Sequence, residues 1–188
     1  MPALTGAQLS RALHQVAQSS SEGPDGLGIR DLALPPPPAW DELAALLTQI
    51  EGGDPWPTAL CQGRVVLIPK GGPDTSVVDA AALRPITVLP QVVRLWGKVR
   101  NRHLGDWASR WMLPTQAGLP GGPGAEELLW HSQMGVERIQ VTGRLAVGVS
   151  VDLRKAFDHV EWDVVGGLAQ TLGAPAGPLQ AALRLYAF

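Results

Sequence analysis

The chain has 188 residues, 45% of them hydrophobic, and a formal net charge of -2. This length suggests one domain or part of a larger one, with enough apolar residues to bury a core. The 22 Gly and 17 Pro predict a folded chain with many turns. The slight negative charge excludes a globally basic nucleic-acid binder, so any such binding must come from a local patch.

The single cysteine, Cys61, excludes an internal disulfide and a metal cluster made of cysteines. We interpret Cys61 as a small buried residue, and a reactive thiol is the alternative. The N-terminal sequence lacks the pattern of a secretory signal, and no apolar run is long enough to cross a bilayer. We therefore expect a soluble chain inside the cell, in the nucleus or the cytoplasm, with no membrane partner.

The first third of the chain predicts two helices around a turn-rich segment. Leucines recur at helical spacing over residues 4–13, which predicts an amphipathic helix that ends before the serine run. "EGPDGLG" (22–28) has the Gly, Pro and Asp content of a turn, and "LPPPPAW" (34–40) is typical of a proline spacer. "WDELAALLTQIEGG" (40–53) predicts a second helix that ends at its glycine pair.

Two extended segments and a helix follow. "RVVLIPK" (64–70) is rich in β-branched residues and predicts a strand, and "LRPITVL" (83–89) also looks extended. We expect these segments to form a short antiparallel ribbon around residues 64–88. The next helix, over 91–103, has two faces, an apolar one with Val92, Trp96, Val99 and His103, and a basic one with Arg94, Lys98 and Arg102.

Positive charge is concentrated around this helix. Between residues 84 and 110 a single acid, Asp106, stands against six basic residues: Arg84, Arg94, Lys98, Arg100, Arg102 and Arg110. A phosphate backbone is a suitable partner for such a basic stripe. The alternative is an ordinary solvated polar face.

The segment "LAVGVSVD" (145–152) predicts a strand that ends on a carboxylate. Side chains alternate between the two faces of a strand. One face would carry Leu145, Val147, Val149 and Val151, and the other Ala146, Gly148, Ser150 and Asp152. The second face is shallow and ends in an acid, which suits a hard cation such as Mg²⁺ bound together with substrate phosphates. Alternatively, Asp152 only caps a turn.

A second acid, Asp158, follows shortly after. Asp158 and Glu161 have the spacing of a capping box before the apolar run 162–172, so we expect a helix start, with metal ligation by Asp158 as the alternative. The intervening "LRKAF" would turn the chain and offer backbone N–H groups to an anion. Phe157 would then form a wall of the site that Asp152 serves.

Together these segments resemble a known family. "VSVDLRKAFDHV" resembles the A motif of reverse transcriptases of non-LTR retrotransposons and group II introns. "GPDGLGIRDL", "VVLIPKGG", "LRPITVLPQVVRLWGKVRNRHL" and "PTQAGLPGG" are similar to the family's preceding motifs and occur in the family's order. The resemblance covers about residues 8–188. Leu119 departs from the usual Phe of its motif, and "PGGPG" lacks the basic residue often found there.

The resemblance implies a role for each matching residue. Asp152 would be the catalytic metal ligand, helped by the Leu153 carbonyl, and Phe157 would exclude a 2′-hydroxyl from the nucleotide site. Lys70 and Arg84 would hold the triphosphate, although Lys70 also fits an ordinary surface lysine and Arg84 a structural ion pair. The residues that would contact nucleic acid are Gly23, Gly26, Arg94, Lys98 and Arg102.

The implied fold is α+β, a right-hand polymerase fragment with fingers over 1–143 and the start of the palm over 144–188. The implied function is RNA-templated DNA synthesis with Mg²⁺, an RNA template, a DNA primer and deoxynucleoside triphosphates. The family's Tyr-x-Asp-Asp hairpin is absent, because no two aspartates are adjacent. We therefore expect a truncated domain that is inactive by itself.

Two alternatives remain open. One is a non-catalytic retroelement remnant that at most binds nucleic acid through the basic stripe formed by Arg94, Lys98 and Arg102. The other is an unrelated metal-dependent phosphotransferase that uses Asp152.

Overall fold

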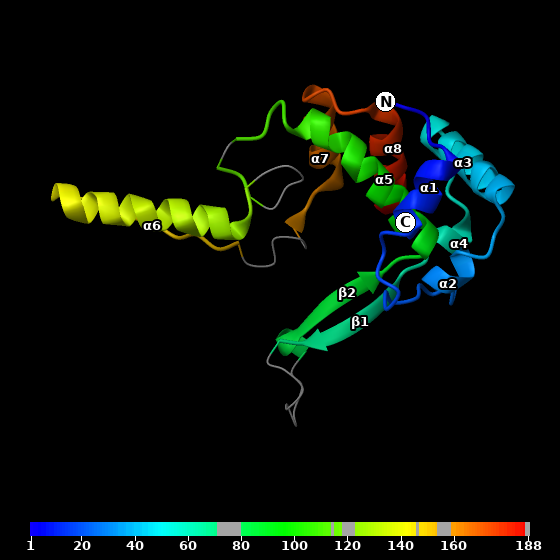
Figure 1. Ribbon diagram of the computed structural model, residues 1–188, viewed down its shortest axis with the longest axis horizontal. Coiled ribbons are helices and arrows are strands. Elements are labelled where there is room, and N and C mark those ends of the chain that lie inside the picture. Colours follow the sequence, from blue (N-terminus) through cyan, green and yellow to red (C-terminus); the bar gives the residue numbers. More distant parts are fainter. Residues whose placement is uncertain (71–79, 114, 118–122, 146, 154–158, 187–188) are drawn as a thin grey trace. The chain divides into compact units, whose positions relative to one another are not determined.

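The computed structural model describes residues 1–70, 80–113, 115–117, 123–145, 147–153 and 159–186. The described part is a mixed α and β structure (Figure 1). Its elements are α1 (Gly6–Leu13), α2 (Ile29–Leu32), α3 (Pro37–Gly52), α4 (Thr58–Cys61), β1 (Arg64–Pro69), the 3-10 turn η1 (Ala80–Ala82), β2 (Leu83–Val88), α5 (Gln91–Ala108), α6 (Ala125–Thr142), α7 (Trp162–Thr171) and α8 (Ala176–Tyr186). The α+β class expected from the sequence is therefore confirmed.

The chain divides into two compact units. Unit 1 comprises Met1–Arg100 together with Ala176–Phe188, and unit 2 comprises Asn101–Pro175. The boundary lies within α5. The division expected between fingers and palm at residue 143 rests on family resemblance and stays a prediction.

Helix α1 begins with a capping box. The Gln8 N–H donates to the Thr5 hydroxyl at 3.2 Å, and the Thr5 N–H donates to the Gln8 side chain at 3.1 Å. These bonds satisfy two backbone donors that the helix start would otherwise leave free. Leu9 and Leu13 lie on the buried face, as their spacing predicts.

Helix α3 begins earlier than the sequence pattern suggested. Pro37 occupies the first turn, where its missing N–H has no helical partner to lose and its fixed φ suits a helix. The proline run is therefore partly helix rather than a spacer. The helix ends where expected, because Gly53 adopts a φ of +130° that other residues rarely reach.

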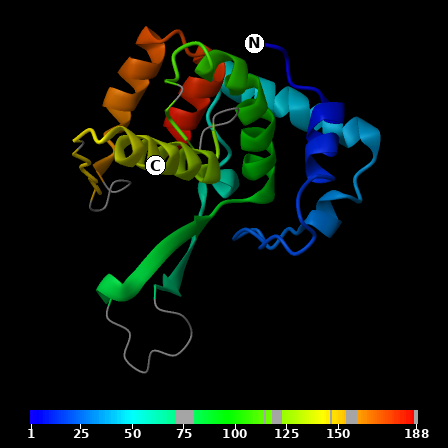
Figure 2. The ribbon, with the colours of Figure 1, turned by 60° about the vertical axis from the view of Figure 1, so that its left-hand side comes forward.

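Strands β1 and β2 form the expected antiparallel ribbon, with Ile68 opposite Arg84 and Val66 opposite Ile86. Both views show the ribbon extending from the helices of unit 1 (Figures 1 and 2). Every residue of β1 is exposed, including Val65 at 58% and Leu67 at 57%. An isolated two-stranded ribbon is marginally stable in water, so its stability depends on its attachment to the helices.

The core of unit 1 lies among α1, α3, α5 and α8. Its larger members are Leu9, Leu13, Trp40, Leu47, Ile50, Trp56, Leu95, Trp96, Val99 and Leu185. Trp56 and Trp96 meet edge to face with ring centroids 5.2 Å apart. The Trp56 indole N–H donates to the Ala181 carbonyl at 2.8 Å, and Arg184 donates to the Ile50 carbonyl. Helix α8 is therefore integral to this unit although it is distant in sequence.

Unit 2 contains α6 and α7, and many of its large apolar side chains are exposed. Trp130 on α6 is 63% exposed and Leu168 on α7 is 59% exposed. Trp107 contacts Trp111, with centroids 5.1 Å apart, and its indole N–H donates to the Leu172 carbonyl at 2.8 Å. In the part of the chain that the structure describes, no helix is long and apolar enough to cross a membrane.

Two local expectations in unit 2 differ from the structure. The described residues of 144–152 form no strand, because a strand requires a hydrogen-bonded neighbour and they have none in the described sheet. Helix α7 begins at Trp162, and the side chain of its N-cap, Glu161, makes no capping bond. The helix therefore begins later than expected, and the capping box stays a prediction because Asp158 lies outside the described residues.

Candidate nucleotide and nucleic-acid site

The predicted catalytic aspartate lies in an exposed segment of unit 2. Asp152 is exposed, and the side chain of Leu153 is 72% exposed. The preceding valines are exposed as well, with Val149 at 83% and Val151 at 79%. Phe157, the predicted wall of the nucleotide site, lies outside the described residues. Asp152 is thus accessible to solvent, and no described element encloses it.

The side-chain donors of the described residues do not complete a magnesium site. Mg²⁺ in phosphoryl-transfer enzymes is held by carboxylates together with substrate phosphates. Among the described residues, no group of three or more His, Cys, Asp or Glu side chains could hold a metal ion. Asp152 supplies one carboxylate, which is insufficient for a two-metal centre.

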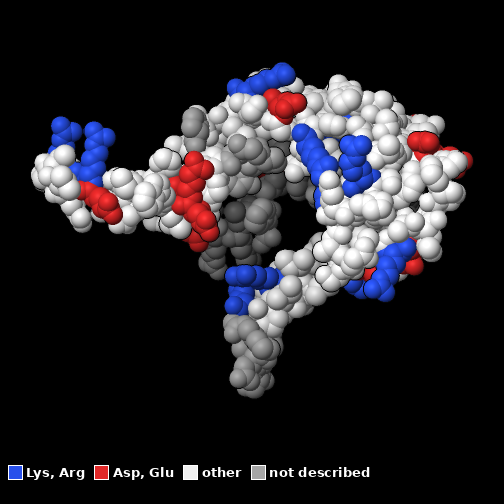
Figure 3. Space-filling view, viewed as in Figure 1, with Lys and Arg blue, Asp and Glu red and all other residues white. Residues whose placement is uncertain are grey.

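Lys70 and Arg84 lie together at the end of the ribbon. The register places Arg84 opposite Ile68, on the same face of the ribbon, and Lys70 directly follows the last residue of β1. The Lys70 N–H continues the ladder by donating to the Ala82 carbonyl at 2.8 Å. Figure 3 shows basic side chains at this end of the ribbon. The structure therefore brings these two predicted triphosphate ligands to the same end of the ribbon.

The Gly-Pro-Asp-Gly turn packs against the start of α5. A Cβ at Gly23 would come within 2.8 Å of the Pro90 Cα, so only glycine fits there without a backbone shift. Gly26 has a φ of +70°, and its N–H closes the turn on the Gly23 carbonyl at 3.2 Å. The Asp25 carboxylate accepts from the Leu27 N–H at 3.3 Å. Both predicted glycines thus shape the turn, and their contact with nucleic acid stays a prediction.

The basic stripe on α5 contacts the chain that follows α1. The Arg94 guanidinium donates to the Ser20 hydroxyl at 3.2 Å and to the Ser21 carbonyl. The Lys98 ammonium donates to the Gln15 carbonyl at 2.8 Å. Arg102, in unit 2, is exposed. Two of the three stripe residues therefore hold a segment of their own chain.

Two further side chains hold the same segment, and the sequence did not reveal them. Arg64 of β1 donates to the Glu22 carbonyl at 2.8 Å. The buried Gln91 side chain donates to the Ser21 carbonyl at 3.4 Å. We name residues 15–22 the clamped segment. Apart from the Ser20 hydroxyl, its acceptors are backbone carbonyls, which leave no signal in a sequence.

Burial affects the electrostatics of Arg94. Desolvation lowers the pKa of its guanidinium from the usual value, and the nearby Asp25 carboxylate opposes this shift. Its Nε is buried and has no hydrogen-bond partner among the described residues. Arg94 is therefore a cation with one unused donor directed into the protein.

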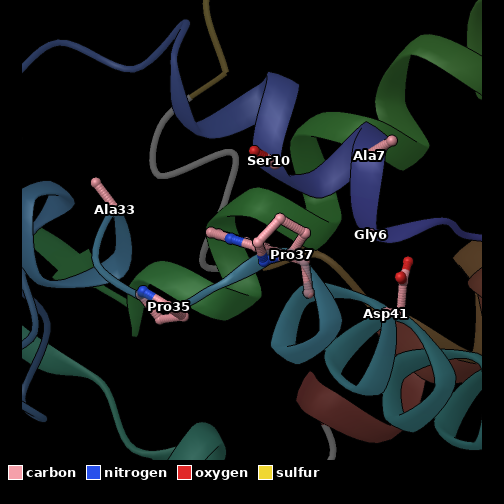
Figure 4. Close-up of a pocket in the computed structure, with 8 residues that line it drawn as sticks. Gly6, Ala7, Ser10, Ala33, Pro35, Pro37 and Asp41 are labelled. Carbon is pink, nitrogen blue, oxygen red and sulfur yellow. The ribbon is translucent and has the colours of Figure 1, made fainter.

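A separate cavity of about 290 Å³ lies in unit 1 between α1 and the start of α3 (Figure 4). It is lined by Gly6, Ala7, Ser10, Ala33, Pro35, Pro37, Trp40 and Asp41. None of these residues was predicted to be functional. The lining contains one carboxylate and no base beside it, so it offers no pair of groups for proton transfer.

The predicted site residues thus fall into three groups. Lys70 and Arg84 share one end of the ribbon, Gly23 and Arg94 lie at the clamped segment, and Asp152 lies in the exposed segment of unit 2. Comparison of the chain with protein-family models and with curated proteins finds no match.

Proposed function

We propose that the chain forms the fingers and the start of the palm of a reverse transcriptase domain. Its parent activity would be RNA-templated DNA synthesis from deoxynucleoside triphosphates. The observation that carries this proposal is the position of Lys70 and Arg84 at the same end of the β1–β2 ribbon. These residues belong to two separate sequence motifs, and the pairing of the strands brings them together.

The chemistry of this pair suits a triphosphate. A phosphate chain carries several negative charges within a few ångströms, and a lysine and an arginine together can neutralise part of that charge. Phosphoryl transfer depends mainly on such positioning and charge stabilisation. The two strands of the ribbon, Arg64–Pro69 and Leu83–Val88, contain neither Asp nor Glu.

Asp152 would supply a carboxylate for the Mg²⁺ ions that such a polymerase uses. The donor set of the described residues does not complete a two-metal centre. The 188 residues also contain no pair of adjacent aspartates. We therefore propose that this chain by itself binds nucleotide without extending a primer.

Nucleotide binding tests the proposal on this chain directly. A fluorescently labelled deoxynucleoside triphosphate is titrated with the chain and followed by anisotropy. Lys70→Ala with Arg84→Ala is expected to weaken binding about tenfold or more, because each charge-assisted bond contributes about 1.5–3 kcal/mol. The matched control is Arg11→Ala with Arg30→Ala, which removes two exposed cations of unit 1 away from the ribbon. Absent binding, or an equal loss in the control, would refute the proposal.

A second candidate function is nucleic-acid binding without catalysis. It is favoured by the exposed Arg102 near the end of α5 and the exposed Arg110 that follows the helix. Salt-dependent RNA binding is expected to persist in Asp152→Ala and to weaken in Arg102→Glu with Arg110→Glu. Arg94 and Lys98 are unsuitable for this test because they hold the clamped segment. Binding that is insensitive to the reversed charges would exclude this surface.

A further inference from the structure

The side chain of Ser20 lies next to a cation that could bind a negatively charged group on that side chain. Its hydroxyl is 3.2 Å from the Arg94 guanidinium, on a half-buried part of the clamped segment. The neighbouring Ser19 and Ser21 are exposed. Of the three serines, Ser20 is the one whose side chain is hydrogen-bonded to a cation among the described residues.

Three cations surround this run of serines. Arg94 holds the Ser21 carbonyl, Lys98 holds the Gln15 carbonyl and Arg64 holds the Glu22 carbonyl. They come from α5 and β1, so the positive charge converges on the segment from two elements. A carbonyl uses only part of the capacity of a cation, because it offers a dipole and not a charge.

One N–H donor of the Arg94 guanidinium makes no hydrogen bond to the described residues. Its Nε is buried without a hydrogen-bond partner among the described residues, and a buried unsatisfied donor costs free energy. A guanidinium presents its N–H groups in a fixed fork that matches the oxygens of a phosphate. A phosphate on the adjacent hydroxyl would have three acceptor oxygens within reach of that fork.

We propose that Ser20 is a phosphorylation site whose phosphate is received by Arg94. The donor would be ATP, acting through a protein kinase. The bond from the Ser20 oxygen to the γ-phosphorus forms as the bridging bond between the β- and γ-phosphates breaks. ADP leaves, and the hydroxyl proton passes to the base of the kinase.

The expected consequence is a tighter clamped segment. The phosphate would replace one neutral hydrogen bond by charge-assisted ones to Arg94, with Lys98 and Arg64 adding longer-range attraction. Glu22 and Asp25 oppose this effect, but in the described part of the chain neither forms an ion pair with Arg94. The inference is independent of the polymerase proposal, since it involves neither Asp152 nor the ribbon end.

Backbone hydrogen exchange tests the inference on the full chain. Phosphoserine is placed genetically at position 20, and exchange of the amides in residues 14–24 is followed by mass spectrometry. Exchange is expected to slow about tenfold relative to the unmodified chain, the equilibrium equivalent of one charge-assisted hydrogen bond. The matched control carries phosphoserine at position 19, whose side chain is exposed, and shows no such slowing.

Arg94→Gln with phosphoserine at position 20 identifies the receptor. The slowing is expected to disappear in this variant and to return in part with Arg94→Lys, which restores charge without the fork. If Arg94→Gln fails to fold, the difference in exchange rate between the chains with phosphoserine at 20 and at 19 still tests the inference. Unchanged or faster exchange with phosphoserine at 20, or equal slowing at 19, would overturn the inference.

Discussion

The carboxylate of Glu51 forms a buried ion pair with the guanidinium of Arg100, joining the end of α3 to the middle of α5. The two side chains are 9% and 4% exposed, and the Arg100 Nε lies 2.5 Å from the carboxylate. The Trp96 indole N–H also donates to Glu51, at 2.8 Å, and Arg100 donates to the Pro2 carbonyl at 2.9 Å. Glu51 lies in the last turn of α3, where the helix dipole disfavours negative charge, so the arginine compensates for its position.

Removing one partner of this ion pair is expected to destabilise unit 1 strongly. Arg100→Leu leaves the Glu51 charge buried without its cation, which costs about 3–5 kcal/mol in the free energy of unfolding. The measurement is urea denaturation followed by tryptophan fluorescence. The double variant Glu51→Leu with Arg100→Leu is expected to lose less than the sum of the single variants. A loss below about 1 kcal/mol in Arg100→Leu would show that the pair is exposed to solvent.

Gly23→Ala is expected to disturb the contact between the Gly-Pro-Asp-Gly turn and α5. The added Cβ would lie 2.8 Å from the Pro90 Cα, and relieving this overlap costs about 1–3 kcal/mol of unfolding free energy. The control is Gly52→Ala, which meets no atom within 4 Å and replaces a poor helix former by a good one. Equal effects of the two substitutions in urea denaturation would argue against the close packing of Gly23.

Arg94 and Arg102 are expected to differ in their effect on stability. Arg94→Gln removes charge-assisted bonds to the clamped segment and lowers the free energy of unfolding by about 1.5–3 kcal/mol. Arg102→Gln alters an exposed residue and changes it by less than about 0.5 kcal/mol. Thermal and urea unfolding of both variants check this difference. A larger effect at Arg102 would contradict the structural role assigned to Arg94.

Cys61 is expected to react slowly with thiol reagents in the native chain. Burial raises the pKa of its thiol, so less of the reactive thiolate is present at pH 8 than in an unfolded chain. Alkylation at pH 8 should therefore accelerate several-fold on addition of urea. The pKa of the Cys61 thiol is higher in the folded chain than in the unfolded chain, so ionisation of this thiol favours unfolding. The free energy of unfolding therefore falls as the pH rises above about 8.5, the pKa of an unfolded thiol. Equal rates with and without urea would contradict this prediction.

The exposed valines before Asp152 are expected to promote self-association without contributing to stability. Val147 and Val149 are 90% and 83% exposed, so their replacement by lysine should change the free energy of unfolding by less than about 0.5 kcal/mol. Light scattering should show less aggregation, because charge interrupts an exposed apolar segment. The control is Leu47→Ala, at a fully buried position, which should cost about 2–5 kcal/mol. A large loss from the lysine variants would show that the valines are packed.

The elements that local signals specify could be predicted from the sequence. Leucine spacing predicted α1, the glycine pair predicted the end of α3, and β-branched residues predicted both strands of the ribbon. The strand before Asp152 was not found, because alternation of side chains describes a face but does not supply a hydrogen-bonded partner. The return of α8 to unit 1 was also missed, since no local signal encodes a contact between Trp56 and Ala181.

Only part of the candidate site could be predicted from the sequence, because motifs identify residues but do not reveal their long-range contacts. Lys70 and Arg84 were identified by motif, and the register of the ribbon explains how they meet. Apart from the Ser20 hydroxyl, the partners of Arg94 and Lys98 are backbone carbonyls more than 70 residues away, which no residue type can signal. Periodicity placed these cations on one face of α5 correctly, but it could not show that the face was already covered by the clamped segment.

Primer extension by a protein that contains these 188 residues together with a Tyr-x-Asp-Asp segment tests the polymerase proposal most directly. The assay uses an RNA template, a DNA primer, Mg²⁺ and all four deoxynucleoside triphosphates, with wild-type protein and Asp152→Asn prepared in parallel. We expect template-dependent extension by the wild type and a loss of extension in Asp152→Asn, with its fold unchanged by circular dichroism. No extension by the wild type, or extension that does not depend on Asp152, would contradict the proposal.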